Sequence, residues 1–204
     1  IKPAVYSEEP ESVDAEDLER SPRNEYGTIY HRVMELMSLS SPRGVIREDF
    51  LEKIVSPLTA VEKDEIRVSS AAFWKSPLGL SVKKASSCHP ELPFIFKTPC
   101  GILKGQIDLA YRDAGQWVIL DYKTNQITPS EAKKTAQGYE FQLGLYAFVF
   151  RELYGEAPAR GILYFSTLKQ AHEFIYTQES LKKVREQLLA GFQRIAVSAG
   201  ISRE

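Results

Sequence analysis

Two short runs rich in apolar residues, separated by a short turn, constrain this fold most. The runs cover residues 102–111 and 116–123, and Asp113, Ala114 and Gly115 between them are typical of a tight turn. Short apolar runs bounded by turn residues predict strands, and so short a turn makes the two strands an antiparallel hairpin. A hairpin buries its apolar side chains against other elements, so the rest of the chain must supply those elements.

Helical spacing of apolar residues dominates before the hairpin, whereas helices and strands alternate after it. We expect helices over residues 25–39, 45–55, 59–68, 71–85, 129–135, 137–154 and 178–197. We expect strands over residues 93–96, 102–111, 116–123, 161–167 and 171–177. This order predicts an α/β fold, with one sheet packed by helices in a single domain over residues 23–204.

The first part of the chain, residues 1–22, is acidic and contains three prolines, Pro3, Pro10 and Pro22. Such a composition is typical of a solvated lead-in or linker. The chain begins at Ile1 without an initiator methionine or the apolar core of a signal peptide. We therefore expect the sequence to be a piece of a longer protein or a trimmed form of one.

Composition limits the classes of function. The chain has 26 Lys and Arg against 27 Asp and Glu, for a net charge of -1, so nucleic-acid binding would need a local patch or a tethered partner. Cys88 and Cys100 are too few for a disulfide framework or an iron–sulfur cluster, and they fit a reducing compartment. No apolar run reaches the length of a membrane span. We expect a cytoplasmic protein without a membrane partner.

Three residues of the hairpin carry the chemistry that the sequence suggests most directly. Because the turn lies near Ala114, the hairpin brings Asp108 and Asp121 opposite one another on neighbouring strands. Facing carboxylates repel, and a divalent cation offsets the repulsion; hard oxygen ligands suit Mg²⁺. Lys123 shares a strand face with Asp121 and would orient or deprotonate a water, or neutralise charge on a phosphate. Taken alone, Asp121 and Lys123 are also compatible with a solvated ion pair.

The order of several short motifs carries a resemblance to a known family. These motifs are Gly27–His31, Glu91–Phe94, Gly105–Asp108, Asp121–Asn125 and Tyr139–Tyr146. Together they resemble the RecB-type nuclease domain of the PD-(D/E)xK superfamily. Within it the pattern is most similar to the C-terminal nuclease domain of AddA-type helicase–nuclease subunits. The resemblance implies a restriction-endonuclease-like core, a central mixed β-sheet flanked by helices, here with an N-terminal helical part.

The resemblance also implies a role for the residues of the hairpin and of the first helix. Asp108 and Asp121 match the metal-binding acids, Lys123 matches the catalytic lysine, and the Tyr122 carbonyl matches a backbone metal ligand. His31 matches a histidine that reaches the metal. By residue type alone, a single helical histidine is more often a surface or capping residue, and imidazole is an unusual ligand for Mg²⁺.

Two residues of the long helix are expected beside the catalytic residues. Gln142 and Tyr146 match the glutamine and tyrosine of the family's helix next to the site. They fall with Tyr139 on one helical stripe, where the Gln142 amide needs a partner; a phosphate, a site residue or a buried backbone group would each serve. For Glu91 the sequence leaves open a supporting role near the metal and a surface position.

The function implied by the resemblance is a Mg²⁺-dependent DNA exonuclease, with Mn²⁺ as a possible substitute. Its substrate would be DNA, single-stranded and delivered from an unwound end, during double-strand-break repair and recombination. Its partners would be a helicase domain in the same parent chain and a second helicase–nuclease subunit. Two alternatives stay open at this point: a free-standing RecB-like exonuclease, and a catalytically silent DNA-binding or scaffolding module of a repair complex.

Overall fold

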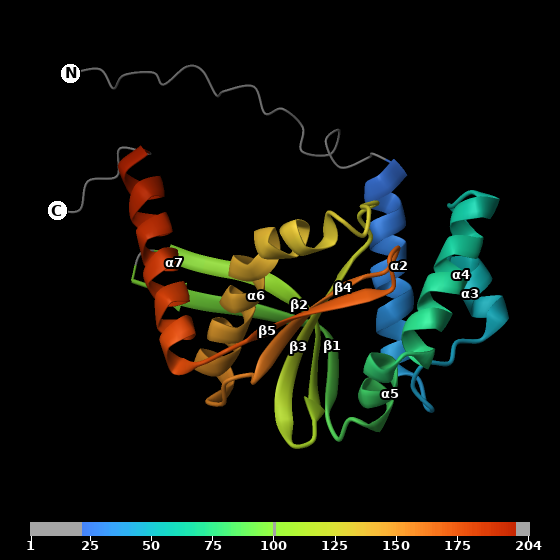
Figure 1. Cartoon of the computed structure of the whole chain (residues 1–204), viewed down its shortest axis with the longest axis horizontal. Coiled ribbons are helices and arrows are strands. Elements are labelled where there is room, and N and C mark those ends of the chain that lie inside the picture. The colour runs from blue at the N-terminus through green and yellow to red at the C-terminus, as the bar shows by residue number, and fades with distance from the viewer. Residues whose placement is uncertain (1–21, 100, 199–204) are drawn as a thin grey trace, which may run out of the picture.

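A five-stranded β-sheet runs through the middle of the molecule and has helices on both faces (Figure 1). The computed structural model describes residues 22–99 and 101–198. The strands lie in the order β1-β2-β3-β4-β5, and β3 is the central strand. The pair β3–β4 is parallel and the other pairs are antiparallel, so the sheet is mixed. The helix α6 makes the crossover that a parallel pair requires.

The elements follow one another in the order that the sequence predicts: helices, three strands, a helix, two strands and a helix. The helices are α2 (Pro22–Leu39), α3 (Glu48–Ile54), α4 (Ala60–Lys75), α5 (Pro77–Lys84), α6 (Ala132–Tyr154) and α7 (Gln178–Ser198). The strands are β1 (Cys88–Thr98), β2 (Gly101–Asp113), β3 (Gln116–Lys123), β4 (Arg160–Phe165) and β5 (Gln170–Ile175).

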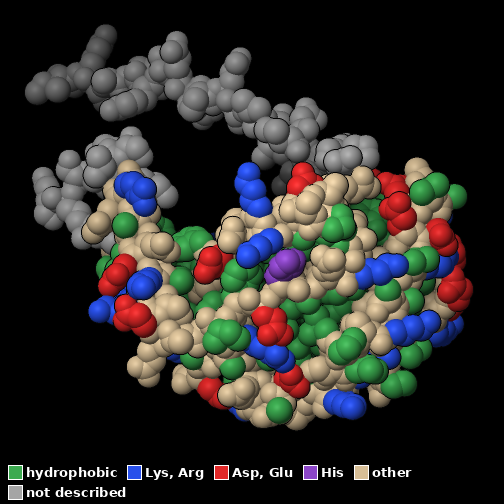
Figure 2. Space-filling model, in the orientation of Figure 1, with side chains coloured by type: hydrophobic (Ala, Val, Ile, Leu, Met, Phe, Trp, Pro, Cys, Tyr) green, Lys and Arg blue, Asp and Glu red, His purple; other side chains and the backbone are tan. Residues whose placement is uncertain are grey.

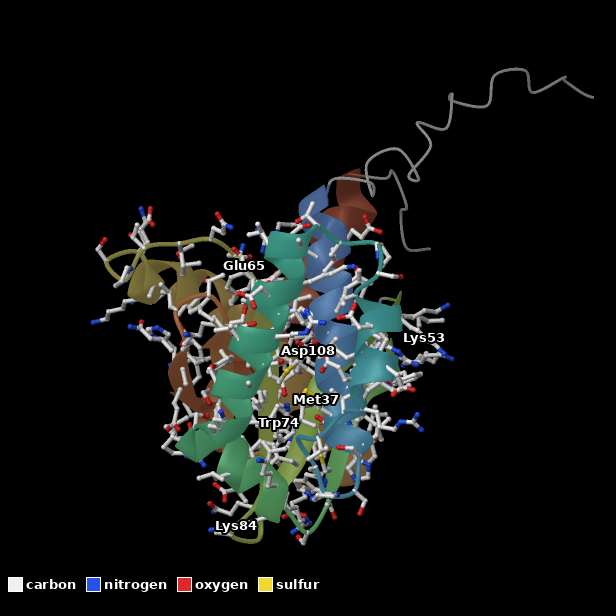
Figure 3. The ribbon with its side chains drawn as sticks, turned by 90° about the vertical axis from the view of Figure 1, so that its right-hand side faces the viewer. Met37, Lys53, Glu65, Trp74, Lys84 and Asp108 are labelled. Carbon is white, nitrogen blue, oxygen red and sulfur yellow. The ribbon has the colours of Figure 1, made fainter. Side chains whose placement is uncertain are left out.

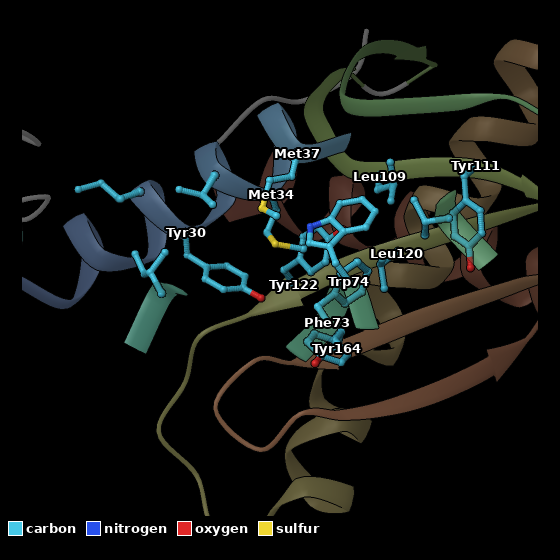
Figure 4. Close-up of a cluster of buried hydrophobic side chains, with 14 of the residues drawn as sticks. Tyr30, Met34, Met37, Phe73, Trp74, Leu109, Tyr111, Leu120, Tyr122 and Tyr164 are labelled. Atoms are coloured by element: carbon cyan, nitrogen blue, oxygen red, sulfur yellow. The ribbon is translucent and has the colours of Figure 1, made fainter. Parts of the chain in front are cut away.

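One face of the sheet packs against the N-terminal helices. Tyr30 and Met34 of α2 and Phe73 and Trp74 of α4 are buried there (Figure 4). They meet strand residues such as Tyr122, whose ring lies 5.4 Å from that of Phe73. Edge-to-face packing of such large rings contributes strongly to a core. This packing fixes α2 against β1 and β2, which is the position that the site below requires.

The other face packs against α6 and α7. Leu143, Ala147 and Phe148 of α6 and Leu181 of α7 are buried with apolar side chains from the strands. Since α6 lies against β3 and β4, it presents its inward stripe to the central strand. The long helix is therefore packed over β3.

Several boundaries differ from the predictions. Residues 59–85 form α4 and α5, which meet at Ser76, whereas the sequence favoured a break near residue 70. Ser76 accepts a hydrogen bond from Gly79 N–H and Pro77 follows it, and this pair of features starts a new helix. Residues 132–154 form one helix where two were expected. The strand expected at 93–96 extends over Cys88–Thr98.

The predicted acidic lead-in, residues 1–22, lies outside the described residues except for Pro22, which begins α2. In the part of the chain that the structure describes, the helices are too short or too polar for any of them to span a bilayer.

Candidate active site

The strands β2 and β3 part at the residues that the sequence singles out. Their last ladder pair is Leu109 with Leu120, and one further step of the same register places Asp108 opposite Asp121. Instead of extending the ladder, Asp108 turns its carboxylate into the opening between the strands, where Oδ2 accepts a hydrogen bond of 2.7 Å from the Tyr122 backbone N–H. In Figure 3, Asp108 is seen between α2 and α4, in the layer of the sheet behind these helices.

The Tyr122 carbonyl faces the same opening. The neighbouring carbonyl, that of Lys123, accepts a hydrogen bond of 2.9 Å from Ser166 N–H just after β4, so it points away from β2. Successive carbonyls along a strand point to opposite edges, and the N–H and C=O of one residue share an edge. The carbonyl oxygen of Tyr122 therefore lies on the Asp108 side of β3, in position to act as an oxygen ligand.

Asp121 is almost completely buried, with 1% of its surface exposed. Its Oδ2 forms an ion pair with Lys123 Nζ at 2.9 Å, and its Oδ1 lies 3.5 Å from Gln142 Nε2 on α6. Apart from this ion pair, Oδ2 accepts no hydrogen bond from the described residues, although it is buried. Burying a carboxylate oxygen with so few partners is costly, and a further positive partner would offset this cost.

Two residues of α6 and one lysine form the wall beside Asp121. Gln142 Nε2 donates to Tyr146 Oη at 2.8 Å, so one amide connects both residues to the carboxylate. Lys123 Nζ lies 4.5 Å from the centre of the Tyr139 ring, within range of a cation–π interaction. These contacts fix the ammonium group of Lys123 between Asp121 and the aromatic ring.

His31 and Glu91 complete the site from the other side. His31 Nδ1 lies 3.4 Å from Asp108 Oδ2 and 3.8 Å from Glu91 Oε1. The pairs Pro90–Leu109 and Leu92–Ile107 bracket Glu91 and place it level with Asp108. Glu91, Asp108 and Asp121 thus form a row of carboxylates across β1, β2 and β3, and α2 holds the imidazole of His31 over it.

The crowding of these groups changes their proton affinities. Burial and the nearby Asp121 charge raise the pKa of Asp108 to about 7. Burial also raises the pKa of Asp121, although the Lys123 ammonium opposes the rise. Burial lowers the pKa of Lys123, but the Asp121 carboxylate more than compensates, and the net pKa is raised. Lys123 is therefore a stable cation.

The same balance applies to His31. Burial lowers its pKa, but the Glu91 and Asp108 carboxylates outweigh burial and raise it overall. The protein thus brings several acids together with fewer positive charges than would neutralise them. Perturbed acids gathered at one point are typical of a catalytic or metal-binding site.

The donor set fits a divalent cation. One ligand atom from each of His31, Glu91 and Asp108 lies within 4.8 Å of the other two. Asp121 lies level with Asp108 on β3 but is not in that group of ligand atoms, and the Tyr122 carbonyl lies on the Asp108 side of β3. Carboxylate and carbonyl oxygens suit Mg²⁺ and Mn²⁺, and imidazole is a better ligand for Mn²⁺ than for Mg²⁺.

The structure brings together every residue that the sequence proposed for the site. His31, Asp108, Asp121, Tyr122 and Lys123 line the opening between the strands, and Gln142 reaches it from α6. Tyr146 contacts Gln142 and reaches the carboxylates through it.

Sequence reasoning left Glu91 undecided and gave Tyr139 no role near Lys123. The strand that carries Glu91 was expected to start at residue 93. Its first residues include Pro90, and proline is rare inside strands, so the beginning of β1 is hard to recognise in the sequence. The pairing of β1 with β2, extended to Asp108, would have placed Glu91 in the row of carboxylates.

Known proteins are similar to this chain in sequence and in fold. A model of the PD-(D/E)XK nuclease superfamily matches residues 6–202. An ATP-dependent helicase/nuclease subunit from Clostridium perfringens is 28% identical over 162 residues, which is 68% of this chain and 13% of that protein. The corresponding helicase/nuclease subunit from Acetivibrio thermocellus is 25% identical over 158 residues, covering 69% of this chain and 12% of that protein.

A solved structure shares the fold. A protein from Eubacterium rectale, described as a candidate exonuclease, superimposes with a TM-score of 0.59 and 15% identity, over 90% of this chain and 70% of that chain. The chain spans 12–13% of the length of the curated helicase/nuclease subunits named above. The superfamily match covers nearly the whole sequence and both halves of the sheet. The chain therefore belongs to the PD-(D/E)XK nuclease superfamily.

Proposed function

We propose that this chain is a divalent-metal-dependent deoxyribonuclease that hydrolyses phosphodiester bonds, with Mg²⁺ as its ion and Mn²⁺ as a substitute. The observation that carries the proposal is the row of Glu91, Asp108 and Asp121 at the opening between β2 and β3, with Lys123 beside it. Acids crowded to this degree need a cation, and a lysine held next to them serves a reaction that develops negative charge.

In this proposal the residues of the site have different roles. Asp108, His31 and Glu91 would hold the ion, together with Asp121 and the Tyr122 carbonyl from β3. A bound divalent cation supplies Lewis-acid chemistry, polarising a phosphate oxygen and lowering the pKa of a water.

Lys123 has a separate task from the ligands. Its raised pKa keeps it protonated, which favours charge stabilisation at the scissile phosphate over a role as general base. Gln142 holds Asp121 from the α6 side, and Tyr146 holds Gln142 in turn. We propose that this pair fixes the carboxylate and a neighbouring phosphate oxygen.

The proposed substrate is DNA, single-stranded and fed from an end by a helicase. The relatives are called helicase/nuclease subunits, and this chain matches a small part of their length. The chain has a net charge of -1, and Figure 2 shows basic side chains interspersed with acidic ones on the visible face. Such a surface suits a domain that receives its strand from neighbours.

In this scheme the partners are a helicase domain of the parent chain and a second helicase–nuclease subunit. The pathway is the processing of double-strand breaks for repair and recombination, in the cytoplasm. The names of the relatives support the helicase partner, and the nuclease superfamily supports the substrate class.

The test is degradation of end-labelled single-stranded DNA by the chain with Mg²⁺. We expect cleavage by the wild type, loss of cleavage in EDTA, and a loss of at least about 100-fold in Asp121→Asn, as for the removal of a group that stabilises the transition state. Asp113→Asn is the matched control, because Asp113 lies on β2 and pairs with Arg160 at 2.6 Å, outside the site.

Equal cleavage by Asp121→Asn and wild type would mean that the activity does not belong to this site. Absence of both cleavage and cation binding in the wild type would favour the alternative, a silent DNA-binding or scaffolding module.

A further inference from the structure

The backbone of Glu91 is unusual for a residue in the middle of a strand. Its φ is +47°, in the left-handed region that residues with a Cβ avoid. The residue sits level with Asp108 between the regular pairs Pro90–Leu109 and Leu92–Ile107. Strain of this kind persists where neighbouring groups hold the residue in place, and such positions concentrate at functional sites.

Gln106 on β2 provides the group that holds Glu91. Its Nε2 donates to Glu91 Oε2 at 2.6 Å and also lies in hydrogen-bonding range of the Glu91 carbonyl oxygen, at 3.3 Å. A side-chain amide nitrogen carries two hydrogens, so it serves both acceptors. One side chain therefore fixes the carboxylate and the strained backbone of Glu91 together.

This arrangement divides the two oxygens of Glu91 between two tasks. Oε2 is bound to Gln106, whereas Oε1 lies 3.8 Å from His31 Nδ1 and belongs to the group of ligand atoms shared with Asp108. Without the amide, the carboxylate would be free to rotate away from Asp108, which it repels. A hydrogen bond that fixes a ligand in this way raises metal affinity without touching the metal.

An independent observation indicates that the opening takes a cation. The Oδ2 atom of Asp121 belongs to a side chain that is 1% exposed, and apart from its ion pair with Lys123 it accepts no hydrogen bond from the described residues. Asp121 lies level with Asp108 on the neighbouring strand, on the side away from Glu91. Asp108 therefore has a further carboxylate on each side, Glu91 on β1 and Asp121 on β3, and such crowding favours a bound cation.

We propose that Gln106 is a positioning residue, which acts through Glu91 to hold a divalent cation among Glu91, His31 and Asp108. This inference rests on the proposed function of the site. Sequence reasoning gave Gln106 no role, since it appeared as one polar position inside a strand.

The test measures Mn²⁺ binding directly, by isothermal titration calorimetry and by the electron paramagnetic resonance signal of free Mn²⁺. We expect Gln106→Leu to weaken binding by about tenfold, the lower end of the range for groups that orient a metal ligand, because Gln106 is exposed. Gln116→Leu is the matched control: the same change on an exposed glutamine at the far end of the hairpin, which should leave Mn²⁺ binding unchanged.

A double-mutant cycle separates action through Glu91 from any other effect. In a Glu91→Ala background, Gln106→Leu should cause no further loss of Mn²⁺ affinity. Gln106→Glu keeps the size of the side chain but replaces the donor by a repelling carboxylate, and it should weaken binding at least as much as Gln106→Leu. Circular dichroism in EDTA checks that each variant is folded.

The outcomes distinguish this inference from the proposed function. Unchanged Mn²⁺ affinity in Gln106→Leu, or an equal loss in the Glu91→Ala background, would overturn the role of Gln106 while wild-type binding and cleavage stand. Absence of Mn²⁺ binding in the wild type would overturn both.

Discussion

Asp108 differs from ordinary surface acids in what surrounds its carboxylate. It accepts a hydrogen bond from the Tyr122 N–H, lies 3.4 Å from His31, and stands between two other acids. The hydrogen bond and the imidazole favour the charged form, whereas burial and the neighbouring carboxylates favour the neutral one. The second pair of effects prevails, so without a metal the Asp108 carboxyl binds a proton up to about neutral pH.

The proton on Asp108 predicts a pH dependence of stability in EDTA. The pKa in the folded chain is about 7, whereas in an unfolded chain it is about 4. This raised pKa contributes to the free energy of unfolding. The contribution is complete below the pKa of the unfolded chain and is lost as pH rises through the pKa of the folded chain. Between about pH 5 and about pH 8, the free energy of unfolding should fall by on the order of 1–3 kcal/mol more in the wild type than in Asp108→Asn.

Urea unfolding of both proteins in EDTA across this range measures the difference. Parallel curves for wild type and Asp108→Asn would show that Asp108 titrates normally, and that the site is less crowded than the structure indicates.

At the level of single residues, the sequence predicts what the local geometry determines. The tight turn at Asp113–Gly115 fixes the hairpin register, so the facing positions of Asp108 and Asp121 follow from counting. Glu91 and Gln106 could not be placed, because the register of β1 and the positive φ of Glu91 depend on contacts between strands. The link from Lys123 to Tyr139 required the angle at which α6 crosses β3.

Among the elements, the pair β1–β2 connects the site to the packing of α6. A Cβ on Gly105 would lie 2.4 Å from the Phe94 ring, so the ring can keep its position only if residue 105 is glycine. The Phe94 ring lies 5.9 Å from that of Tyr146, whose hydroxyl accepts the hydrogen bond from Gln142. Gly105 therefore affects the position of the Phe94 ring, and through it the position of Tyr146 and Gln142 beside the site.

This contact predicts the effect of Gly105→Ala. The added methyl group displaces the Phe94 ring, and we expect a loss of about 1–3 kcal/mol in the free energy of unfolding, as for an overpacked core. Phe94→Leu in the same chain should restore part of the loss by making room. Urea denaturation measures each variant.

Gly191→Ala in α7 is the control. An added Cβ there meets nothing within 4 Å, so the helix should gain about 0.5–1 kcal/mol. If Gly105→Ala were as stable as the wild type, the close contact with Phe94 would not hold in solution.

The helix boundaries show which parts of an element can be predicted. The start of α5 depends on the Ser76 cap and Pro77, which lie inside the helix expected over residues 71–85. The single helix α6 runs through Ala136, where a break was expected between helices over residues 129–135 and 137–154. Packing on β3 and β4 stabilises the continuous helix, which tolerates Gly138 near its start.

For the whole molecule, charge is the property that bears most on DNA binding. Positive and negative side chains are nearly equal in number, and several arginines are paired with acids, such as Arg160 with Asp113 and Glu173. Among the described residues, exposed lysines such as Lys133, Lys134 and Lys182 form no ion pair, and they are offset only by the acids elsewhere on the surface. The fold class was predictable because the hairpin and the order of elements allow few arrangements, whereas the charge pairing depends on the folded surface.

The charge balance predicts a weak dependence of DNA binding on salt. A domain with about three phosphate contacts gives a slope near -2 for the logarithm of the association constant against the logarithm of salt concentration on single strands. Fluorescence anisotropy with Asp121→Asn and Ca²⁺ measures this slope without cleavage. A slope several times steeper would reveal a basic DNA-binding surface and argue against delivery of the strand by a neighbour.

The position of a bound ion tests the proposed chemistry most directly. Crystals of the chain soaked in Mn²⁺ should give an anomalous peak at the opening between β2 and β3, within ligand distance of Asp108 and Asp121 and next to His31. The peak should be absent in Asp108→Asn. An empty opening in the wild type, or Mn²⁺ bound elsewhere with these carboxylates turned apart, would contradict a metal-dependent nuclease site at this place.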